Sequence, residues 1–111
     1  MSAITTHILD TTKGRPASDV RVELDFDQSG WHNVGEGHTD SDGRVKTLLS
    51  GQKLQAGTYR LRFHVGSYFK QIGSSAFYPY VEIVFLVEAT DEHYHVPLLL
   101  NPFGYSTYRG S

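Results

Sequence analysis

An alternation of apolar and polar side chains marks two segments of the chain as β-strands. Between residues 20 and 27 every second side chain is apolar and the residues between them are charged. Residues 59–65 repeat this pattern, with arginine and histidine at the polar positions. Because successive side chains of a strand point to opposite faces, each segment is predicted to have one buried and one hydrated face.

Three apolar runs predict further strands at residues 4–9, 81–87 and 94–100. The run at 81–87 is apolar on both faces, so we expect this strand at the centre of a sheet. The run at 94–100 contains Pro97, which has no N–H to donate to a neighbouring strand. That strand is therefore expected to lie at a sheet edge or to carry a bulge.

Turn signals and one helix signal separate these runs. Glycine supplies the positive φ of a tight turn in three dipeptides, Lys13-Gly14, Asp42-Gly43 and Ala56-Gly57. Residues 67–72, SYFKQI, lie between Gly66 and Gly73 and have the apolar spacing of one or two helical turns, with Ser67 as the expected N-cap. Residues 74–80 are expected to form a loop.

Roughly seven or eight short strands and one short helix predict an all-β fold, a β-sandwich. The chain has 111 residues, the size of one domain, which we place at residues 1–111. This length buries a core without the help of metal or disulfides. The absence of cysteine excludes a disulfide framework, a thiolate zinc site and a cysteine nucleophile.

The distribution of charge limits the classes of binding partner. The formal net charge is −2 and no block of like charges occurs, so a nucleic-acid surface is not expected. No apolar stretch is long enough to span a membrane. The first ten residues lack the basic and apolar regions of a secretory signal, so we expect a cytoplasmic protein. Asp40 and Asp42 lack the rest of a calcium-binding loop and are interpreted as turn formers.

Histidines are the main candidates for acid–base chemistry, because imidazole exchanges a proton near neutral pH. His32 and His38 lie in a glycine-rich polar stretch and are expected to be solvated, and His64 belongs to a hydrated strand face. His93 and His95 are two residues apart in a strand and share one face. A zinc site there needs a third ligand from histidines or carboxylates, and metal binding is not expected.

Three other side chains stand out as candidates. His7 interrupts the run ITTHIL and shares a polar strand face with Thr5. Arg44 directly follows the Asp42-Gly43 turn, and Arg109 lies near the end of the sequence. The guanidinium group offers planar, forked donors that suit oxyanions and carbonyl groups.

Five segments together resemble one family. They are Thr5-Thr6-His7-Ile8-Leu9-Asp10-Thr11, Asp42-Gly43-Arg44, Phe77-Tyr78-Pro79-Tyr80, His93-Tyr94-His95-Val96-Pro97-Leu98-Leu99-Leu100 and the closing Tyr108-Arg109-Gly110-Ser111. Over its whole length the sequence resembles the 5-hydroxyisourate hydrolases, the transthyretin-like proteins of purine breakdown. The closing tetrapeptide is the specific element, because transthyretin shares the fold but lacks this ending.

The resemblance implies a transthyretin-like sandwich of two four-stranded sheets with one short helix. It also implies a homotetramer around a central channel, with sites at the subunit interfaces. Catalytic residues of the family correspond to His7, Arg44 and His95, and substrate-binding residues to His7, Arg44, Tyr108, Arg109 and Ser111. The implied reaction opens the six-membered ring of 5-hydroxyisourate to give 2-oxo-4-hydroxy-4-carboxy-5-ureidoimidazoline, with no metal or organic cofactor.

The expected roles are water activation by His95 or the His7–His95 pair, carbonyl polarisation by Arg44, and substrate positioning by Arg109 and Ser111. Tyr108 is expected to anchor the tail by packing and a hydrogen bond. The lack of cysteine and of a convincing serine–histidine–aspartate pattern favours direct attack by water. These roles require the last four residues to fold inward beside the imidazoles.

Three alternatives stay open on the sequence. A small-ligand carrier, as transthyretin is for hormones, predicts an apolar channel and a dispensable tail. A structural or adhesive sandwich is compatible with the strand pattern but has no feature in its favour. A metal-dependent hydrolase would use His93 and His95.

Overall fold

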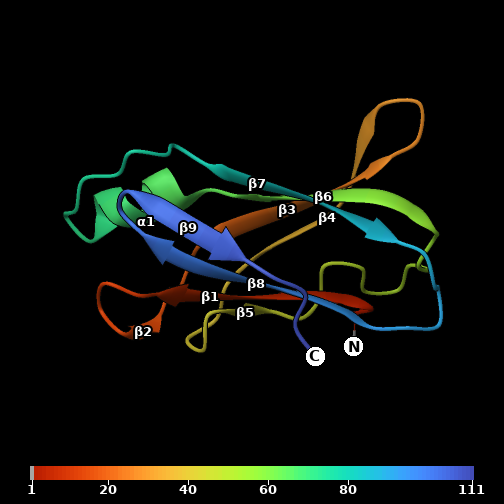
Figure 1. Ribbon diagram of the computed structural model, residues 1–111, viewed down its shortest axis with the longest axis horizontal. Helices are drawn as coiled ribbons and strands as arrows, with labels where there is room; N and C mark the ends of the chain where they lie inside the picture. Colours follow the sequence, from red (N-terminus) through yellow and green to blue (C-terminus); the bar gives the residue numbers. More distant parts are fainter. Residues whose placement is uncertain (1) are drawn as a thin grey trace.

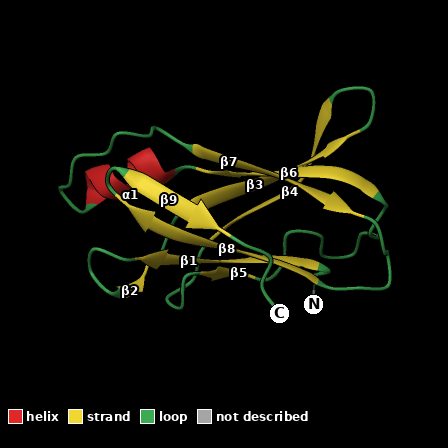
Figure 2. Ribbon diagram, in the orientation of Figure 1, coloured by secondary structure: helices red, strands yellow, loops and turns green. Residues whose placement is uncertain are grey.

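Two β-sheets lie face to face in the computed structural model, which describes residues 2–111 (Figures 1 and 2). The strands are β1 (Ile4–Asp10), β2 (Arg15–Pro16), β3 (Arg21–Asp27), β4 (Trp31–His38), β5 (Arg44–Val45), β6 (Gly57–Phe63), β7 (Val81–Val87), β8 (Tyr94–Asn101) and β9 (Gly104–Thr107). The helix α1 (Val65–Gln71) lies at one end of the sandwich. The predicted all-β sandwich with one short helix is confirmed.

The two sheets differ in size. One has four strands, as predicted, and their order is β4-β3-β6-β7. The other has five, in the order β2-β1-β8-β9 with β5 paired to β1. The fifth strand arises because β2 and β5, each two residues long, both pair with β1. β1 and β8 run parallel, and all other pairs are antiparallel.

The core lies between the sheets and is built from the apolar positions of the alternating strands. Val22 and Leu24 of β3 and Leu61 and Phe63 of β6 are completely buried. From the other sheet Ile4 and Ile8 of β1 and Leu98 and Leu100 of β8 complete this core. The charged positions of β3 and β6 point to the other face, where Arg60 contacts Asp25 at 2.7 Å. The predicted buried face is confirmed. The charged face is hydrated only in part, because Asp25, which pairs with Arg60, is itself buried.

The position of β7 corrects a prediction. Its bounds, Val81–Val87, agree with the sequence, but it lies at the edge of its sheet, paired only with β6. Its outward side chains Val84 and Leu86 are 59% and 58% exposed. Apolar side chains on both faces of a strand therefore do not indicate a central position in this sheet. On β7 the outward apolar side chains form an exposed strip at the sheet edge.

Pro97 also lies where it was not expected. It belongs to β8, which lies inside its sheet between β1 and β9. The β8–β9 ladder starts only at the next residue, where Leu98 pairs with Thr107. The Pro97 carbonyl accepts a hydrogen bond from the Thr107 hydroxyl at 2.7 Å instead. An interior strand tolerates this proline because the ladder to β9 is interrupted at that position.

The helix begins earlier than the sequence suggested. It covers residues 65–71, and its N-cap position is His64, without a capping side chain, so Ser67 is not the cap. Val65 is fully buried and anchors the first turn in the core. The second helical residue is a glycine, Gly66, because the loop at Pro79 packs closely against it. A Cβ at this position would lie 2.7 Å from the Pro79 carbonyl oxygen. Residues 74–80 form the predicted loop.

Strand β4 was missed because glycines break its alternation. A Cβ on Gly35 would lie 1.8 Å from the carbonyl oxygen of Leu48, and one on Gly37 would lie 2.9 Å from the Val45 side chain. The glycines thus allow the segment after β5 to cross directly over the strand. His32 and His38, also in β4, are exposed as predicted.

Candidate active site

Three strands that are far apart in sequence place the candidate side chains next to one another. β1 lies between β5 and β8. Their register puts Thr5 opposite His95 and His7 opposite Arg44. The sheet therefore assembles the three predicted catalytic residues on adjacent strands.

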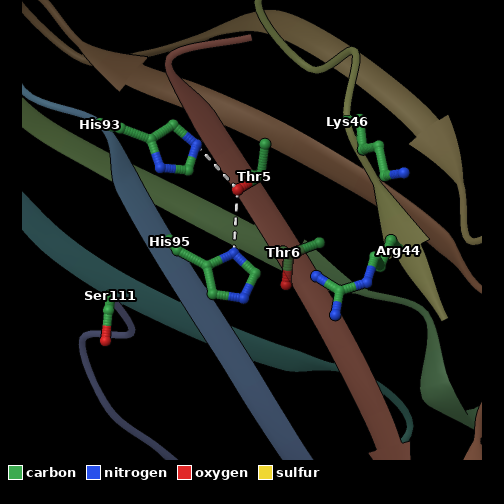
Figure 3. Close-up of a pocket in the computed structure, with 7 residues that line it drawn as sticks. All are labelled: Thr5, Thr6, Arg44, Lys46, His93, His95 and Ser111. Atoms are coloured by element: carbon green, nitrogen blue, oxygen red, sulfur yellow. Dashed lines mark hydrogen bonds between the residues drawn. The ribbon is translucent and has the colours of Figure 1, made fainter. Parts of the chain in front are cut away.

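A surface pocket of about 170 Å³ lies over this junction (Figure 3). Its lining residues are Thr5, Thr6, Arg44, Lys46, His93, His95 and Ser111. All of them carry a polar or charged side chain. Arg44, His95 and Ser111 were predicted from the sequence. His7 is half-buried on the same face of β1 as Thr5, just outside this lining.

The turn before β5 holds Arg44 in place. The Asp40 carboxylate accepts hydrogen bonds from the backbone N–H groups of Asp42 and Arg44 at 2.9 and 3.0 Å. These two bonds also lower the pKa of Asp40, mainly the one from Arg44. Asp40 thus closes the turn, as predicted. Gly43 in this turn has a φ of +75°, a conformation that favours glycine.

The Thr5 hydroxyl lies between two imidazoles. Its oxygen is 2.9 Å from Nδ1 of His95 and 3.1 Å from Nε2 of His93. The two rings are stacked, with centroids 6.4 Å apart. Nε2 of His95 is turned away from Thr5, toward the side of the pocket where Arg44 lies (Figure 3).

The surroundings of His95 favour its neutral form. Burial is the largest cause that lowers its pKa, and the positive charge of Arg44 is the next. His7 and His93 lower the pKa further, whereas a backbone hydrogen bond with Thr5 opposes the shift. A histidine whose pKa lies below its ordinary value of 6.5 is neutral at pH 7 and able to accept a proton.

The end of the chain folds against His95. The Gly110 N–H donates to the His95 carbonyl at 2.8 Å, which forms an isolated β-bridge. A Cβ on Gly110 would lie only 2.6 Å from Cδ2 of the His95 ring. The tail therefore lies beside an imidazole, as expected from the sequence, and glycine makes this close contact possible.

Tyr108 and Arg109 lie on the other side of the tail. Nη2 of Arg109 is 2.8 Å from a carboxylate oxygen of Glu92, and its guanidinium lies 4.5 Å from the Tyr94 ring centroid. Tyr108 is 58% exposed. Both line a second, more apolar pocket of about 230 Å³ that runs along β7 and β8. Within one chain, Tyr108 and Arg109 share this second pocket with His95, and they do not line the pocket that contains Arg44 and Ser111.

Thr5, Lys46 and His93 also line the pocket, although none of them was among the predicted site residues. Thr5 precedes His7 by two positions and Lys46 follows Arg44 by two, so the period of a strand contained a signal for both. His93 was considered only as a metal ligand. In the structure His93 contacts the Thr5 hydroxyl and stacks on the His95 ring, and all three residues line the pocket.

Two further findings concern ligands and membranes. Among residues 2–111 no group of three histidine, aspartate or glutamate side chains is arranged to share one metal ion. The same part of the chain contains no helix with the length and apolar character of a membrane span.

Comparisons with known proteins agree with this architecture. The sequence is 47% identical to a 5-hydroxyisourate hydrolase of Caulobacter vibrioides over the full length of both chains. The fold matches the structure of the Klebsiella pneumoniae 5-hydroxyisourate hydrolase with a TM-score of 0.85 and 34% identity, covering 97% of this chain and 98% of that one. It also matches sea bream transthyretin in complex with thyroxine, with a TM-score of 0.92 and 33% identity over 98% and 95% of the two chains. A family model spans residues 4–110, and the chain belongs to the HIUase/Transthyretin family.

Proposed function

We propose that this chain is a hydrolase that opens the six-membered ring of 5-hydroxyisourate to give 2-oxo-4-hydroxy-4-carboxy-5-ureidoimidazoline. The observation that carries the proposal is the polar pocket in which Arg44, His95 and Ser111 meet. The relatives named 5-hydroxyisourate hydrolase, similar over nearly the whole chain, support the same reaction.

His95 activates the attacking water in this proposal. Its neutral ring accepts a proton from the water through Nε2, the nitrogen turned away from Thr5. General base catalysis of this kind contributes about 10²–10⁴-fold in rate. His7, half-buried beside Thr5 on β1, assists in holding the water or in the second proton transfer.

Arg44 binds the substrate carbonyl and stabilises the negative charge that develops on its oxygen. Its guanidinium lines the pocket with His95, and a donor aimed at a developing oxyanion contributes roughly 10²–10³-fold. Ser111 and Arg109 position the substrate. In a single chain Arg109 pairs with Glu92 and lines the second pocket, so in this proposal it reaches the substrate of a neighbouring subunit.

A homotetramer with sites at the subunit interfaces is part of the proposal. The apolar strip of β7, Val84 and Leu86, is exposed. Tyr105 of β9 and Tyr108, which follows β9, are 41% and 58% exposed. Burial of such surface against another copy of the chain is favourable. Light scattering should then give a mass near four times the 12.5 kDa of one chain.

A carrier function is the second candidate, because the fold matches a transthyretin structure that contains thyroxine. A carrier of an apolar ligand requires an apolar site. Polar and charged side chains line the pocket with Arg44 and Ser111, so a carrier would use the more apolar pocket along β7 and β8. Deletion of residues 108–111 separates the candidates. The hydrolase should lose activity while the protein stays folded, and a carrier should keep its ligand affinity.

The direct test follows the ultraviolet absorbance of freshly generated 5-hydroxyisourate with and without the protein. We expect the protein to accelerate the decay, and His95→Ala to remove most of that acceleration. No acceleration by the unmodified protein would reject the function. Full activity in both His7→Ala and His95→Ala would instead reject the assignment of the site.

Two points need separate experiments. A metal-dependent mechanism through His93 and His95 predicts loss of activity after thorough chelation, whereas the proposed mechanism predicts retention.

A cytoplasmic location stays a prediction from the sequence, and fractionation of the source cells tests it.

A further inference from the structure

The contact of Thr5 with two histidines limits the protonation states of the pocket. A threonine hydroxyl has one hydrogen to donate, and it accepts through its oxygen lone pairs. The hydroxyl of Thr5 lies within hydrogen-bond distance of Nδ1 of His95 and Nε2 of His93. When both rings are neutral and both bonds are formed, Thr5 donates to one ring and accepts from the other.

Two states follow from this single hydrogen. In the first, Thr5 donates to Nε2 of His93 and accepts from Nδ1–H of His95, which leaves Nε2 of His95 without a proton. In the second, Thr5 donates to Nδ1 of His95 and accepts from Nε2–H of His93. Because a neutral imidazole carries one N–H, Nε2 of His95 then holds the proton. The first state makes His95 a base toward the pocket, and the second makes it an acid.

The two imidazoles differ in where they can hold a positive charge. His93 is exposed, whereas His95 is partly buried. Burial, the positive charge of Arg44 in β5 and His7 on β1 disfavour a cation on His95. A proton that reaches His95 is therefore more stable on His93, where water solvates the charge.

We propose that Thr5 couples the protonation of His95 to that of His93, so that the solvent-facing imidazole stores the proton taken from the attacking water. This inference rests on the proposed function for the origin of the proton. Thr5 acts as a positioning residue in this proposal, since it acts through the two imidazoles that it contacts.

The proton balance of the cycle closes within these three residues. Water attacks the substrate and gives a proton to Nε2 of His95. The Nδ1 proton of His95 then passes to the Thr5 oxygen, while the Thr5 hydroxyl proton passes to Nε2 of His93. When the leaving nitrogen takes the proton from Nε2 of His95, the same path runs backward and restores the proton on Nδ1. No proton is gained or lost apart from the one moved from water to the leaving nitrogen.

Nitrogen NMR of the histidine side chains tests the coupling without any substrate, because it distinguishes protonated from bare ring nitrogens. In the unmodified protein, the ring nitrogen signals of His93 and His95 should change together on acidification. His95 should change at the same pH from a ring with a bare Nε2 to a ring with a bare Nδ1. In Thr5→Val, which keeps the shape but removes the hydroxyl, this change of His95 should no longer follow His93. An unchanged nitrogen pattern in Thr5→Val would overturn the proposal.

Kinetics provide the second readout. We expect Thr5→Val to lower kcat by roughly tenfold or more, a part of the 10²–10⁴-fold that acid–base catalysis supplies, with KM little changed. Thr5→Ser keeps the hydroxyl and should retain both kcat and the coupled titration. Thr11→Val is the matched control. It removes a threonine hydroxyl that donates to the Leu100 carbonyl of β8 and contacts neither imidazole, and it should leave kcat unchanged.

A double variant separates coupling from independent effects. His93→Gln removes the titrating ring, and its kcat should fall about as far as that of Thr5→Val. If the two residues act through one path, the double variant loses no more than either single variant, whereas multiplied losses would contradict the coupling. Should the unmodified protein fail to accelerate the decay of 5-hydroxyisourate, the proposed function is rejected, while the NMR experiment still decides the role of Thr5.

Discussion

At the scale of single residues, the site depends on one neutral imidazole beside a fixed positive charge. Arg44 begins β5, directly after the turn that Asp40 closes, and His95 belongs to the strand on the other side of β1. The sheet thus holds the guanidinium close enough for its positive charge to lower the pKa of His95. Such an arrangement keeps His95 able to accept a proton near neutral pH.

The charge of Arg44 should be visible in the titration of His95. Its positive charge lowers the pKa of His95, so Arg44→Gln should raise this pKa toward the ordinary value. If His95 is the base, the acid limb of kcat/KM moves to higher pH by the same amount. Side-chain NMR measures the pKa directly, which separates this effect from the loss of substrate binding. A His95 pKa that is unchanged or lower in Arg44→Gln would contradict the arrangement.

Gly110 should be required for the tail to lie on His95. In Gly110→Ala the new methyl group would lie 2.6 Å from the His95 ring and 3.2 Å from Pro97, so the tail must move away. We expect a loss of kcat with little change in thermal stability, because the tail contributes little to the core. Gly104→Ala is the control, since its Cβ meets only the Asn101 side chain at 3.7 Å. Equal activities of the two variants would show that this contact is dispensable.

At the scale of elements, β4 and the segment that crosses it explain why sequence patterns are incomplete. Gly35 adds no apolar side chain to β4, so the strand lacks the alternation that marks β3 and β6. Its function is spatial, since it gives room to the backbone at Leu48. Because the glycine is explained only by the segment that crosses β4, the strand cannot be identified from its own residues alone.

A side chain at Gly35 should destabilise the whole sandwich. The Cβ of Gly35→Ala would overlap the Leu48 carbonyl oxygen at 1.8 Å, and backbone cannot turn aside as a flexible side chain can. We expect a loss of about 1–3 kcal/mol or more in the free energy of unfolding, as for other overpacked sites. Denaturant titration measures it. A midpoint like that of the unmodified protein would mean that the crossing segment is free to shift.

The hydrated face of β3 and β6 should make stability depend on pH. His64 contacts the Glu23 carboxylate at 2.6 Å, and this hydrogen bond is the main cause that lowers the Glu23 pKa, followed by the charges of Arg21 and Arg62. A carboxyl with a lowered pKa stabilises the fold above its ordinary pKa of 4.5 and loses this contribution as the pH falls through the folded-state value. The stability gap between the unmodified protein and Glu23→Gln should therefore shrink on acidification below that range.

Chemical unfolding at several pH values measures this gap. Glu88→Gln, at an exposed position after β7, is the control and should leave the pH dependence unchanged. A gap that stays constant from neutral to acidic pH would show that Glu23 does not titrate with folding.

At the scale of the whole molecule, the edge strand β7 links the fold to its assembly. Its exposed strip of Val84 and Leu86 explains why the segment is apolar on both faces, although only one face meets the core of its own chain. The unpaired edge of β7 and the apolar strip together suit contact with another copy.

A charge in this strip should break the assembly. We expect Val84→Asp to lower the mass in solution below that of a tetramer, because an unpaired carboxylate cannot be buried cheaply at an interface. Light scattering provides the measurement, and Lys13→Glu, an exposed change in the β1–β2 turn, is the control. Activity should fall together with the mass if the sites require two subunits. A full-mass Val84→Asp would move the interface to another face.

The sequence alone determined the strands with a strict period of two, the turn glycines and the residue types able to perform the chemistry. These properties are local, because side-chain alternation and backbone freedom depend on a few neighbouring residues. The sequence also indicated the family, since its motifs recur along the whole chain.

Only the tertiary structure decided which strands lie at an edge and which side chains meet. Pro97 lies inside a sheet because the ladder to β9 begins one residue later, and Ser67 loses the N-cap to His64 because Val65 is buried in the core. Thr5 bonds two histidines that follow it by 88 and 90 positions. Contacts over such separations depend on how the sheet orders its strands, and no local pattern of side chains records that order.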